Sequence, residues 1–262
     1  MRYLGIIPAR YASSRFPGKP LALLGGKPVV QHVYERVSEV LDSVWVATDS
    51  EPILQAVEAF GGRAVMTSAA HRSGTDRCRE AFEKISAAAA AQGEVDFDVV
   101  INVQGDEPFI APDQVRALAA CFEDPATEIA TLVKPFRPED GWEALSNPNS
   151  PKVVVNCDGY ALYFSRSVIP YMRGMECGEW LSSGRQVYYK HIGIYAYRAE
   201  ALRRITELEQ SPLELAESLE QLRWLENGLR IKTAVTDVET IGIDTPEDLV
   251  RAEQFLTEHP WR

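Results

Sequence analysis

The chain has 262 residues, 45% of them hydrophobic, so it can bury a substantial core without disulfide or metal staples. Its formal net charge of -11 argues against a nucleic-acid partner, and no apolar run approaches the length of a membrane span. Four scattered cysteines without a Cys-x-x-Cys pair favour reduced thiols, and Arg10 and Arg15 interrupt any signal-peptide segment. We therefore expect a cytoplasmic protein that folds as a single α/β domain over residues 1–262 and contacts no membrane.

The first predicted strand, Tyr3–Ile7, leads into a basic loop that is rich in Gly, Pro and Ser. No acidic residue precedes Glu35, whereas cations recur through this stretch at Arg2, Arg10, Arg15, Lys19 and Lys27. The loop is either an ordinary solvated surface or a cradle for a polyanion such as a nucleoside triphosphate. Because Gly18-Lys19 and Gly26-Lys27 are each followed by proline, neither matches the phosphate loop of P-loop NTPases.

Strands and helices alternate through the first half of the chain. The predicted strands are Tyr3–Ile7, Ser43–Thr48, Arg63–Thr67 and Asp98–Val103, and the predicted helices are Pro28–Leu41, Glu51–Phe60 and Thr75–Ala91. This alternation predicts a doubly wound, mostly parallel sheet with right-handed crossovers. Ligands of such sheets bind beyond the carboxyl ends of the strands, so the loops 8–19, 48–50, 68–76 and 104–108 should share one rim.

The pattern changes from about residue 125. Short extended runs separated by turns predict a smaller antiparallel lobe over about residues 129–197; they are Ile129–Lys134, Lys152–Cys157, Ala161–Phe164 and His191–Tyr197. A helix over Pro212–Glu226, a strand over Leu229–Val238 and a closing helix over Pro246–Glu258 complete the expected fold.

Two carboxylates follow apolar strands. Asp106 lies on a turn just past the central strand, where it is either part of a polar turn or a ligand for Mg²⁺. Asp244 precedes Thr245 and Pro246, which form an ordinary helix start, so spacing alone does not decide between a capping role and a metal-binding role.

Three further motifs have competing interpretations. In Ser73–Arg77, Thr75 is a candidate N-cap, while Gly74 permits close backbone approach and Arg77 adds a cation near the rim. His191 alone is more typical of a structural histidine. Asp96-Phe97-Asp98 resembles the Asp-x-Asp motif of some glycosyltransferases, but it precedes its strand, which favours a helix-to-strand turn.

Over nearly its whole length the chain resembles the 3-deoxy-manno-octulosonate cytidylyltransferases, or CMP-KDO synthetases, of the wider nucleotide-diphospho-sugar transferase fold. The resemblance rests on ordered motifs: Ile7-Pro8-Ala9-Arg10-Tyr11-Ala12-Ser13-Ser14-Arg15, Pro17-Gly18-Lys19-Pro20-Leu21, Val46-Ala47-Thr48-Asp49, Ser73-Gly74-Thr75-Asp76-Arg77, Asn102-Val103-Gln104-Gly105-Asp106-Glu107-Pro108, Tyr160–Arg166, His191–Tyr195, Leu219–Arg223 and Asp244–Asp248. Asp76 stands where many members have Glu, Lys190 where some have Arg, and Arg173–Gln186 matches poorly.

The resemblance implies a role for residues at each motif. The CTP-binding residues it implies are Arg10, Ser13, Arg15, Lys19, Ser73, Gly74 and Arg77. It implies that Asp106 and Asp244 hold Mg²⁺ and that Arg10 and Lys19 act with them in catalysis. The sugar-acid pocket it implies consists of Gln104, Arg166, His191, Tyr195 and Glu220. It also implies a homodimer whose subunits meet through the antiparallel lobe.

The reaction implied is CTP plus 3-deoxy-manno-octulosonate giving CMP-KDO and pyrophosphate, a step in lipopolysaccharide synthesis. The anomeric hydroxyl attacks the α-phosphorus in line, and such transfers depend mainly on positioning and charge neutralisation. Another sugar acid, such as a sialic acid or an 8-amino-octulosonate, is an alternative substrate. A glycosyltransferase and a non-catalytic nucleotide sensor are the alternatives from other functional classes.

Overall fold

The computed structural model of the protein describes residues 1–12, 15–239 and 241–258. These described residues form two compact units. Of the described residues, the first unit takes those within 1–116, 196–206 and 241–258, and the second takes those within 117–195 and 207–239. None of the described helices is both long enough and apolar enough to cross a membrane.

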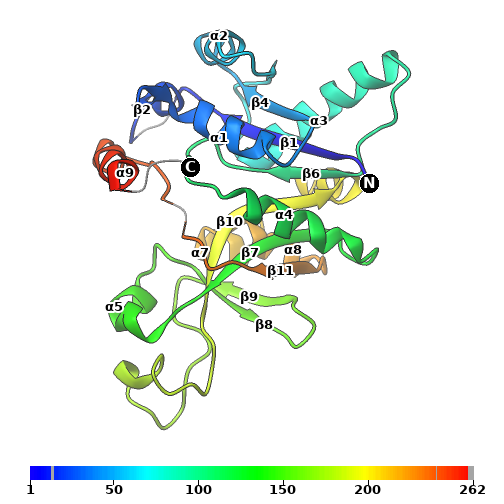
Figure 1. The fold of residues 1–262 in the computed structure, drawn as a ribbon. Helices are drawn as coiled ribbons and strands as arrows, with labels where there is room; N and C mark the ends of the chain where they lie inside the picture. Colours follow the sequence, from blue (N-terminus) through cyan, green and yellow to red (C-terminus); the bar gives the residue numbers. More distant parts are fainter. Residues whose placement is uncertain (13–14, 240, 259–262) are drawn as a thin grey trace. The chain divides into compact units, whose positions relative to one another are not determined.

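The first unit is built on parallel strands in the order β6-β1-β4-β5 (Figure 1). The strands are β1 (Tyr3–Ala9), β4 (Val44–Thr48), β5 (Ala64–Met66) and β6 (Val99–Asn102). The connecting helices are α1 (Val29–Ser38), α2 (Glu51–Ala59) and α3 (Gly74–Ala91). Every residue of β1 after Tyr3 is buried, as expected for a central parallel strand covered on both faces.

The strand order reverses at β1. The chain moves outward from β1 through β4 to β5 and then returns to place β6 on the other side of β1. Right-handed crossovers place α1 and α2 on one face of such a sheet and α3 on the other. The predicted doubly wound sheet is therefore confirmed, and its ligand-binding crevice is expected between the carboxyl ends of β1 and β6.

Shorter elements complete the first unit. They are the turn η1 (Lys19–Leu21), the hairpin of β2 (Leu23–Leu24) and β3 (Lys27–Pro28), and the helices α6 (Ala199–Thr206) and α9 (Pro246–Glu258). The helix α4 (Pro112–Ala120) begins in the first unit and ends in the second. The helices α4 and α6 were not predicted from the sequence.

Helix starts near the crevice follow capping rules. The hydroxyl of Ser73 accepts a hydrogen bond from the N–H of Asp76, so Ser73 is the N-cap of α3, and the prediction of Thr75 as cap is wrong. Thr75 lies inside the first turn and is buried. At α9 the predicted cap is confirmed, because Thr245 Oγ1 accepts from the N–H of Asp248 at 3.2 Å.

The second unit contains a mixed set of strands. They are β7 (Ile129–Pro135), β8 (Lys152–Val155), β9 (Ala161–Ser165), β10 (Tyr189–Arg198) and β11 (Ile231–Val235), of which β10 continues into the first unit after Tyr195. As predicted for this lobe, β8 pairs antiparallel with both β9 and β10. In contrast, β11 pairs in parallel with β7.

Helical segments of the second unit depart from the prediction at one point. The single helix predicted over Pro212–Glu226 is wrong, because α7 (Pro212–Glu217) ends at Ser218, which has a left-handed φ of 51°, and α8 (Glu220–Glu226) begins two residues later. The guanidinium of Arg166 donates to the carbonyl of Glu217 at 2.6 Å and to that of Ser218 at 3.3 Å. These bonds satisfy carbonyls that a continuous helix would otherwise pair.

The remaining elements of the second unit are η2 (Cys121–Glu123), η3 (Pro138–Asp140), α5 (Gly141–Ser146) and η4 (Cys177–Glu179). The poorly matching stretch Arg173–Gln186 contains η4 and is held by Trp180, which is buried against Leu145 and Tyr188.

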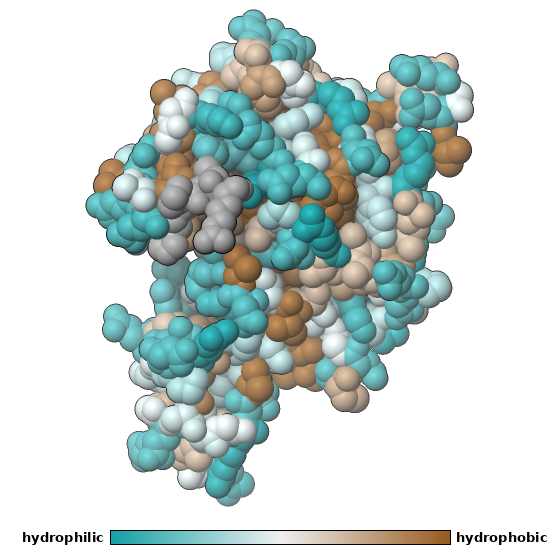
Figure 2. Space-filling view, viewed as in Figure 1, coloured by the Kyte–Doolittle hydropathy of each residue, from teal (hydrophilic) through white to brown (hydrophobic). Residues whose placement is uncertain are grey.

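All four cysteines are free thiols, and only Cys78 is buried. Hydrophilic residues predominate on the face drawn in Figure 2, with apolar residues scattered among them.

His191 on β10 belongs to the core of the second unit. Its Nε2 lies 3.0 Å from the hydroxyl of Thr131, and its ring packs edge-on against Phe164 with the centroids 5.0 Å apart. Burial lowers the pKa of His191 from 6.5 to about 3, so the ring is neutral at physiological pH.

This shift predicts a pH-dependent contribution to stability. The unfolded chain binds a proton at His191 near pH 6.5 and the folded chain only near pH 3, so stability is lost as the pH falls through that window. In chemical denaturation, the free energy of unfolding of wild type relative to His191→Gln should fall by about 3 kcal/mol between pH 7 and pH 4. A difference that does not change with pH would contradict a buried neutral ring.

Candidate active site

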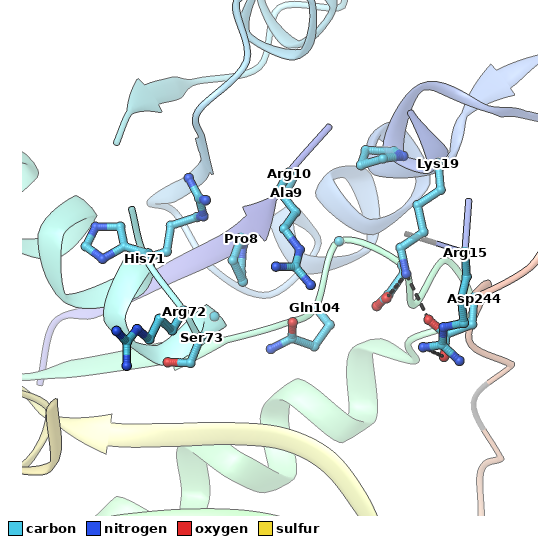
Figure 3. Close-up of a pocket in the computed structure, with 15 residues that line it drawn as sticks. Pro8, Ala9, Arg10, Arg15, Lys19, His71, Arg72, Ser73, Gln104 and Asp244 are labelled. Atoms are coloured by element: carbon cyan, nitrogen blue, oxygen red, sulfur yellow. Dashed lines mark hydrogen bonds and ion pairs between the residues drawn. The ribbon is translucent and has the colours of Figure 1, made fainter. Parts of the chain in front are cut away.

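A pocket of about 220 Å³ opens at the switch point between β1 and β6 (Figure 3). The residues that line it come from the loops after these strands, from the start of α3 and from the segment before α9. They are Pro8, Ala9, Arg10, Arg15, Lys19, Pro20, His71, Arg72, Ser73, Gly74, Arg77, Gln104, Gly105, Asp106 and Asp244. The predicted rim is therefore confirmed for the loops after β1, β5 and β6.

The two predicted carboxylates meet at one lysine. The ammonium of Lys19 donates to Asp106 Oδ2 at 2.5 Å and to Asp244 Oδ1 at 3.0 Å. In Figure 3 Lys19, Arg15 and Asp244 lie on one side of the pocket, and His71, Arg72 and Ser73 lie on the other. Three residues far apart in sequence thus form one charged cluster beside the basic loop.

Backbone contacts bring Asp106 and Asp244 together. The N–H of Ile243 donates to the carbonyl of Asp106 at 2.9 Å, which fixes Asp244 next to the turn after β6. That turn lies so close to β1 that a Cβ on Gly105 would be 2.9 Å from the carbonyl oxygen of Pro8, a distance that real Cβ atoms do not tolerate. Glycine at position 105 is therefore required for the turn to carry Asp106 into the pocket.

Lys19 is largely buried although it belongs to the basic loop after β1. Only 13% of its side chain is exposed, and it opens the short turn η1. Burial by itself would lower the pKa of Lys19, but the charges and hydrogen bonds of Asp106 and Asp244 outweigh burial and raise it. The ammonium therefore stays charged between the two carboxylates.

The pocket carries an excess of positive charge in an acidic protein. Among the described residues that line it, five are cationic (Arg10, Arg15, Lys19, Arg72 and Arg77) and two are carboxylates. Arg15 pairs with Asp244 Oδ2 at 3.0 Å, yet 64% of the Arg15 side chain is exposed, so this contact is weak and easily exchanged. A polyanion would find several cations there that it can engage.

Arg77 differs from the other cations. Its guanidinium is buried, pairs with Asp49 at 2.7 Å and donates to Thr67 Oγ1 at 2.6 Å. Asp49 follows β4, so the 48–50 loop also reaches this rim through Arg77. These bonds hold Arg77 in the pocket wall, where it joins α3 to the segments that carry Asp49 and Thr67.

Three residues predicted to bind the nucleotide remain, namely Ser73, Gly74 and Ser13. Ser73 and Gly74 line the pocket at the start of α3, and a Cβ on Gly74 would lie 3.3 Å from the side chain of Gln104. Gln104 also lines the pocket, and its Nε2 donates to Asn102 Oδ1 at 3.1 Å. Ser13, predicted to bind nucleotide, lies outside the described residues.

Two pocket residues with polar side chains were not predicted from the sequence. His71 and Arg72 line the pocket immediately before Ser73, in a loop that was expected at the rim but from which no residue before Ser73 was named. The signal that could have found them is the cation at position 72 next to the Ser-Gly helix start.

The other predicted sugar-acid residues lie in the second unit. His191 and Tyr195 are buried neighbours on β10 with ring centroids 5.4 Å apart, and Tyr195 packs against Trp224 of α8. Glu220, the first residue of α8, accepts from Arg223 at 2.9 Å. Arg166 holds the end of α7, as described above. Among these four residues, ring contacts join His191 to Tyr195, and join Tyr195 to the helix that Glu220 begins.

The chemistry of the Asp106–Asp244 pair suits a divalent cation. Both carboxylates face one point that a cationic group, the Lys19 ammonium, already contacts, and hard oxygen ligands are those that Mg²⁺ prefers. Within the described residues, no group of three or more His, Cys, Asp or Glu side chains is arranged to hold a metal. A cation bound by this pair would therefore take its other ligands from water or from a bound ligand.

The sequence and the fold both match known proteins. A family model described as cytidylyltransferase matches residues 4–231. The 3-deoxy-manno-octulosonate cytidylyltransferase of Phocaeicola vulgatus is 64% identical over 98% of both chains, and that of Bacteroides thetaiotaomicron is 62% identical over the same shares.

Solved structures give the same result. A CMP:2-keto-3-deoxy-manno-octonic acid synthetase complexed with CTP matches with a TM-score of 0.86 and 43% identity, covering 98% of this chain and 99% of that one. A 4-diphosphocytidyl-2C-methyl-D-erythritol synthase from Anaerococcus prevotii matches with a TM-score of 0.57 at 13% identity over 98% and 96% of the two chains, and so shares the fold. The chain therefore belongs to the cytidylyltransferase family and, within it, to the 3-deoxy-manno-octulosonate cytidylyltransferases.

Proposed function

We propose that this protein transfers the cytidylyl group of CTP to the anomeric hydroxyl of 3-deoxy-manno-octulosonate, giving CMP-KDO and pyrophosphate. The observation that carries the proposal is the Lys19–Asp106–Asp244 cluster at the switch point of the sheet. Nucleotidyl transfer depends on positioning and charge neutralisation rather than on a covalent intermediate. A rim of cations beside paired carboxylates supplies both.

The triphosphate would bind through the cationic side of the pocket. Arg10 is exposed and makes no ion pair with the described residues, so it is available to a phosphate. Lys19 and Arg15 would exchange their carboxylate partners for phosphate oxygens. The N-terminus of α3, capped by Ser73, adds backbone N–H groups and the positive end of a helix dipole.

Asp106 and Asp244 are the residues that would hold Mg²⁺. When bound there, the ion would neutralise phosphate charge and lower the pKa of the attacking hydroxyl. The chain's own part is to hold the two carboxylates at one point, through Gly105 and the Ile243 N–H, and to keep Lys19 charged beside them.

For the sugar acid, we propose as binding residues the five that the resemblance implies: Gln104, Arg166, His191, Tyr195 and Glu220. Because His191 is neutral, it contributes hydrogen bonding and shape rather than positive charge. The charge that a sugar carboxylate needs would come from Arg166, whose guanidinium now donates to backbone carbonyls. A homodimer formed through the antiparallel lobe stays a prediction from the resemblance, and a cytoplasmic location stays a prediction from the composition.

The alternatives are weaker. Asp96 and Asp98 precede β6, and Asp98 Oδ2 accepts from the backbone N–H of Arg2 at 2.7 Å, as expected for a structural turn rather than a glycosyltransferase motif. A nucleotide sensor would not need two carboxylates converging on one cation. Activation of another sugar acid by the same reaction is the nearest alternative. The names of the relatives favour 3-deoxy-manno-octulosonate over other sugar acids.

Pyrophosphate release tests this function. With CTP and 3-deoxy-manno-octulosonate, turnover should far exceed turnover with ATP or GTP, because we expect the start of α3 at Ser73–Thr75 to leave too little room for a purine. The same assay with a sialic acid and with an 8-amino-octulosonate ranks the sugar acids. Equal rates with ATP, or faster turnover of another sugar acid, would reject the substrate assignment.

Replacement of Lys19 should impair catalysis. Lys19→Met should lower kcat/KM by about 10²-fold or more, the scale for loss of one preorganised charge contact. Lys27→Met is the matched control, because Lys27 lies in the same acid-free stretch, is exposed and pairs with Glu35 outside the pocket. Steady-state kinetics that give the two variants the same value would remove Lys19 from the mechanism.

Neutralising either carboxylate should remove cation binding in the presence of nucleotide. Asp106→Asn and Asp244→Asn should each weaken Mn²⁺ binding to the CTP-loaded protein, measured by electron paramagnetic resonance, and depress turnover while leaving the circular dichroism spectrum unchanged. Asp113→Asn, an exposed carboxylate on α4, is the control. Wild-type Mn²⁺ affinity in both pocket variants would show that the cation binds elsewhere.

A further inference from the structure

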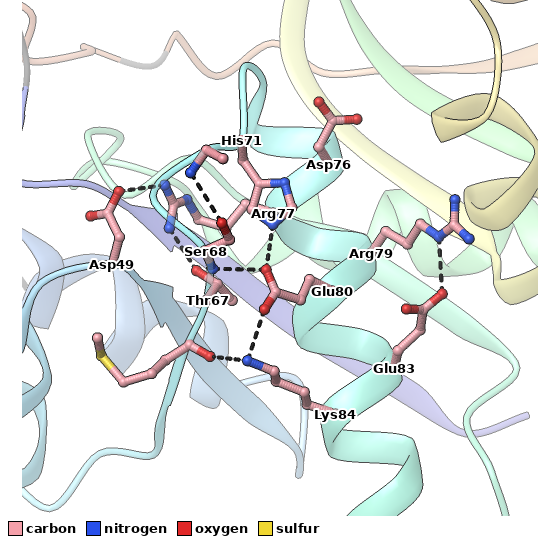
Figure 4. Close-up of polar contacts among 12 residues, drawn as sticks. Asp49, Thr67, Ser68, His71, Asp76, Arg77, Arg79, Glu80, Glu83 and Lys84 are labelled. Carbon is pink, nitrogen blue, oxygen red and sulfur yellow. Dashed lines mark hydrogen bonds and ion pairs between the residues drawn. The ribbon is translucent and has the colours of Figure 1, made fainter.

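Side chains on one face of α3 form hydrogen bonds with the loop that precedes this helix (Figure 4). Arg77, Glu80 and Lys84 are spaced by three and four residues, so they project from the same side of the helix. All three bind the segment Met66–His71, which links β5 to the pocket residues Arg72 and Ser73. This segment has no helix or strand after Met66 that could hold it in place.

Glu80 is the centre of these contacts. Its carboxylate accepts from the backbone N–H of Ser68 at 2.8 Å, pairs with Lys84 at 2.7 Å and accepts a hydrogen bond from Nε2 of His71. Burial would raise the pKa of Glu80, but the hydrogen bonds from Lys84, Ser68 and His71 outweigh burial and lower it to about 2. The carboxylate is therefore fully charged and bound at both oxygens.

Neighbouring side chains extend the same anchorage. Arg77 donates to Thr67 Oγ1, and Lys84 donates to the carbonyl of Met66 at 2.8 Å. His71 lines two spaces at once: the site pocket, and an adjoining cavity of about 500 Å³ that Glu80 also lines. The loop is thus attached to α3 at successive residues just before it enters the pocket wall.

We propose that Glu80 is a positioning residue for the nucleotide. Its carboxylate fixes the segment 68–71 and thereby holds Arg72 and Ser73 at the pocket before the ligand arrives. Ordering a loop on binding costs conformational entropy that a preordered loop has already lost, so loss of Glu80 should weaken ligand binding without any lost ligand contact. This proposal rests on the proposed function, because that function identifies the ligand as CTP.

Glu83 provides the matched control. It lies on the same helix, is a carboxylate of the same length, lines the same 500 Å³ cavity and pairs with a cation, Arg79, at 2.9 Å. In the described part of the chain its ion pair stays within α3 and does not reach the 66–73 segment. A general loss of negative charge or of helix stability should therefore affect Glu83→Gln and Glu80→Gln alike.

The test compares Glu80→Gln, Glu80→Ala and Glu83→Gln in the full-length protein by two measurements. Calorimetric titration with CTP alone should give a Kd about tenfold higher for Glu80→Ala, the scale of one charge-assisted hydrogen bond, with Glu80→Gln between it and wild type. Glu83→Gln should match wild type, and kcat at saturating CTP should be nearly unchanged in all three. Wild-type Kd in both Glu80 variants would overturn the proposal, as would an equal loss in Glu83→Gln.

Amide hydrogen exchange without nucleotide is the second measurement. Residues 68–73 should exchange faster in both Glu80 variants, while β1 and β6 keep wild-type protection. Unchanged exchange in that loop, or faster exchange spread over the strands, would overturn the positioning role. If wild type fails to bind CTP, the proposed function falls, and the exchange data still decide whether Glu80 holds the loop.

Discussion

The arrangement of the site depends on one ammonium shared by two carboxylates. Asp106 and Asp244 come from distant parts of the chain and would repel each other if left alone, but Lys19 binds both from a largely buried position. The burial of Lys19 strengthens its attraction to Asp106, of which only 26% is exposed, whereas Asp244 is 47% exposed and water weakens its attraction to the ammonium. The free protein thus holds a charged ammonium between two hard oxygen ligands.

The fold constrains where such a cluster can form. At the reversal of strand order the loops after β1 and β6 leave room for a ligand, and the Gly105 turn brings Asp106 to that place. The Ile243 backbone then fixes Asp244 beside it, and α3 supplies the opposite wall. Rigid strands thus set the position of the charges, while the loop that carries Arg72 is held by the ion pairs and hydrogen bonds of α3 side chains.

Much of this arrangement could be predicted from the sequence, because local patterns determine it. Apolar strands alternating with helices specified the sheet, and the cap at Thr245 was evident from Thr-Pro spacing. The burial of Lys19 could not be predicted, since its partners lie 87 and 225 positions away. The break at Ser218 also escaped prediction, because it depends on Arg166, a residue remote in sequence. The family resemblance, rather than spacing, singled out Asp244 as a metal ligand.

The most direct test of the account is a crystal structure of the protein with Mg²⁺ and a non-hydrolysable CTP analogue. Carboxylate oxygens of Asp106 and Asp244 should lie about 2.1 Å from the same ion, and the ammonium of Lys19 should contact a phosphate oxygen instead. A structure in which Lys19 still joins both carboxylates while the ion and the triphosphate bind elsewhere would contradict it.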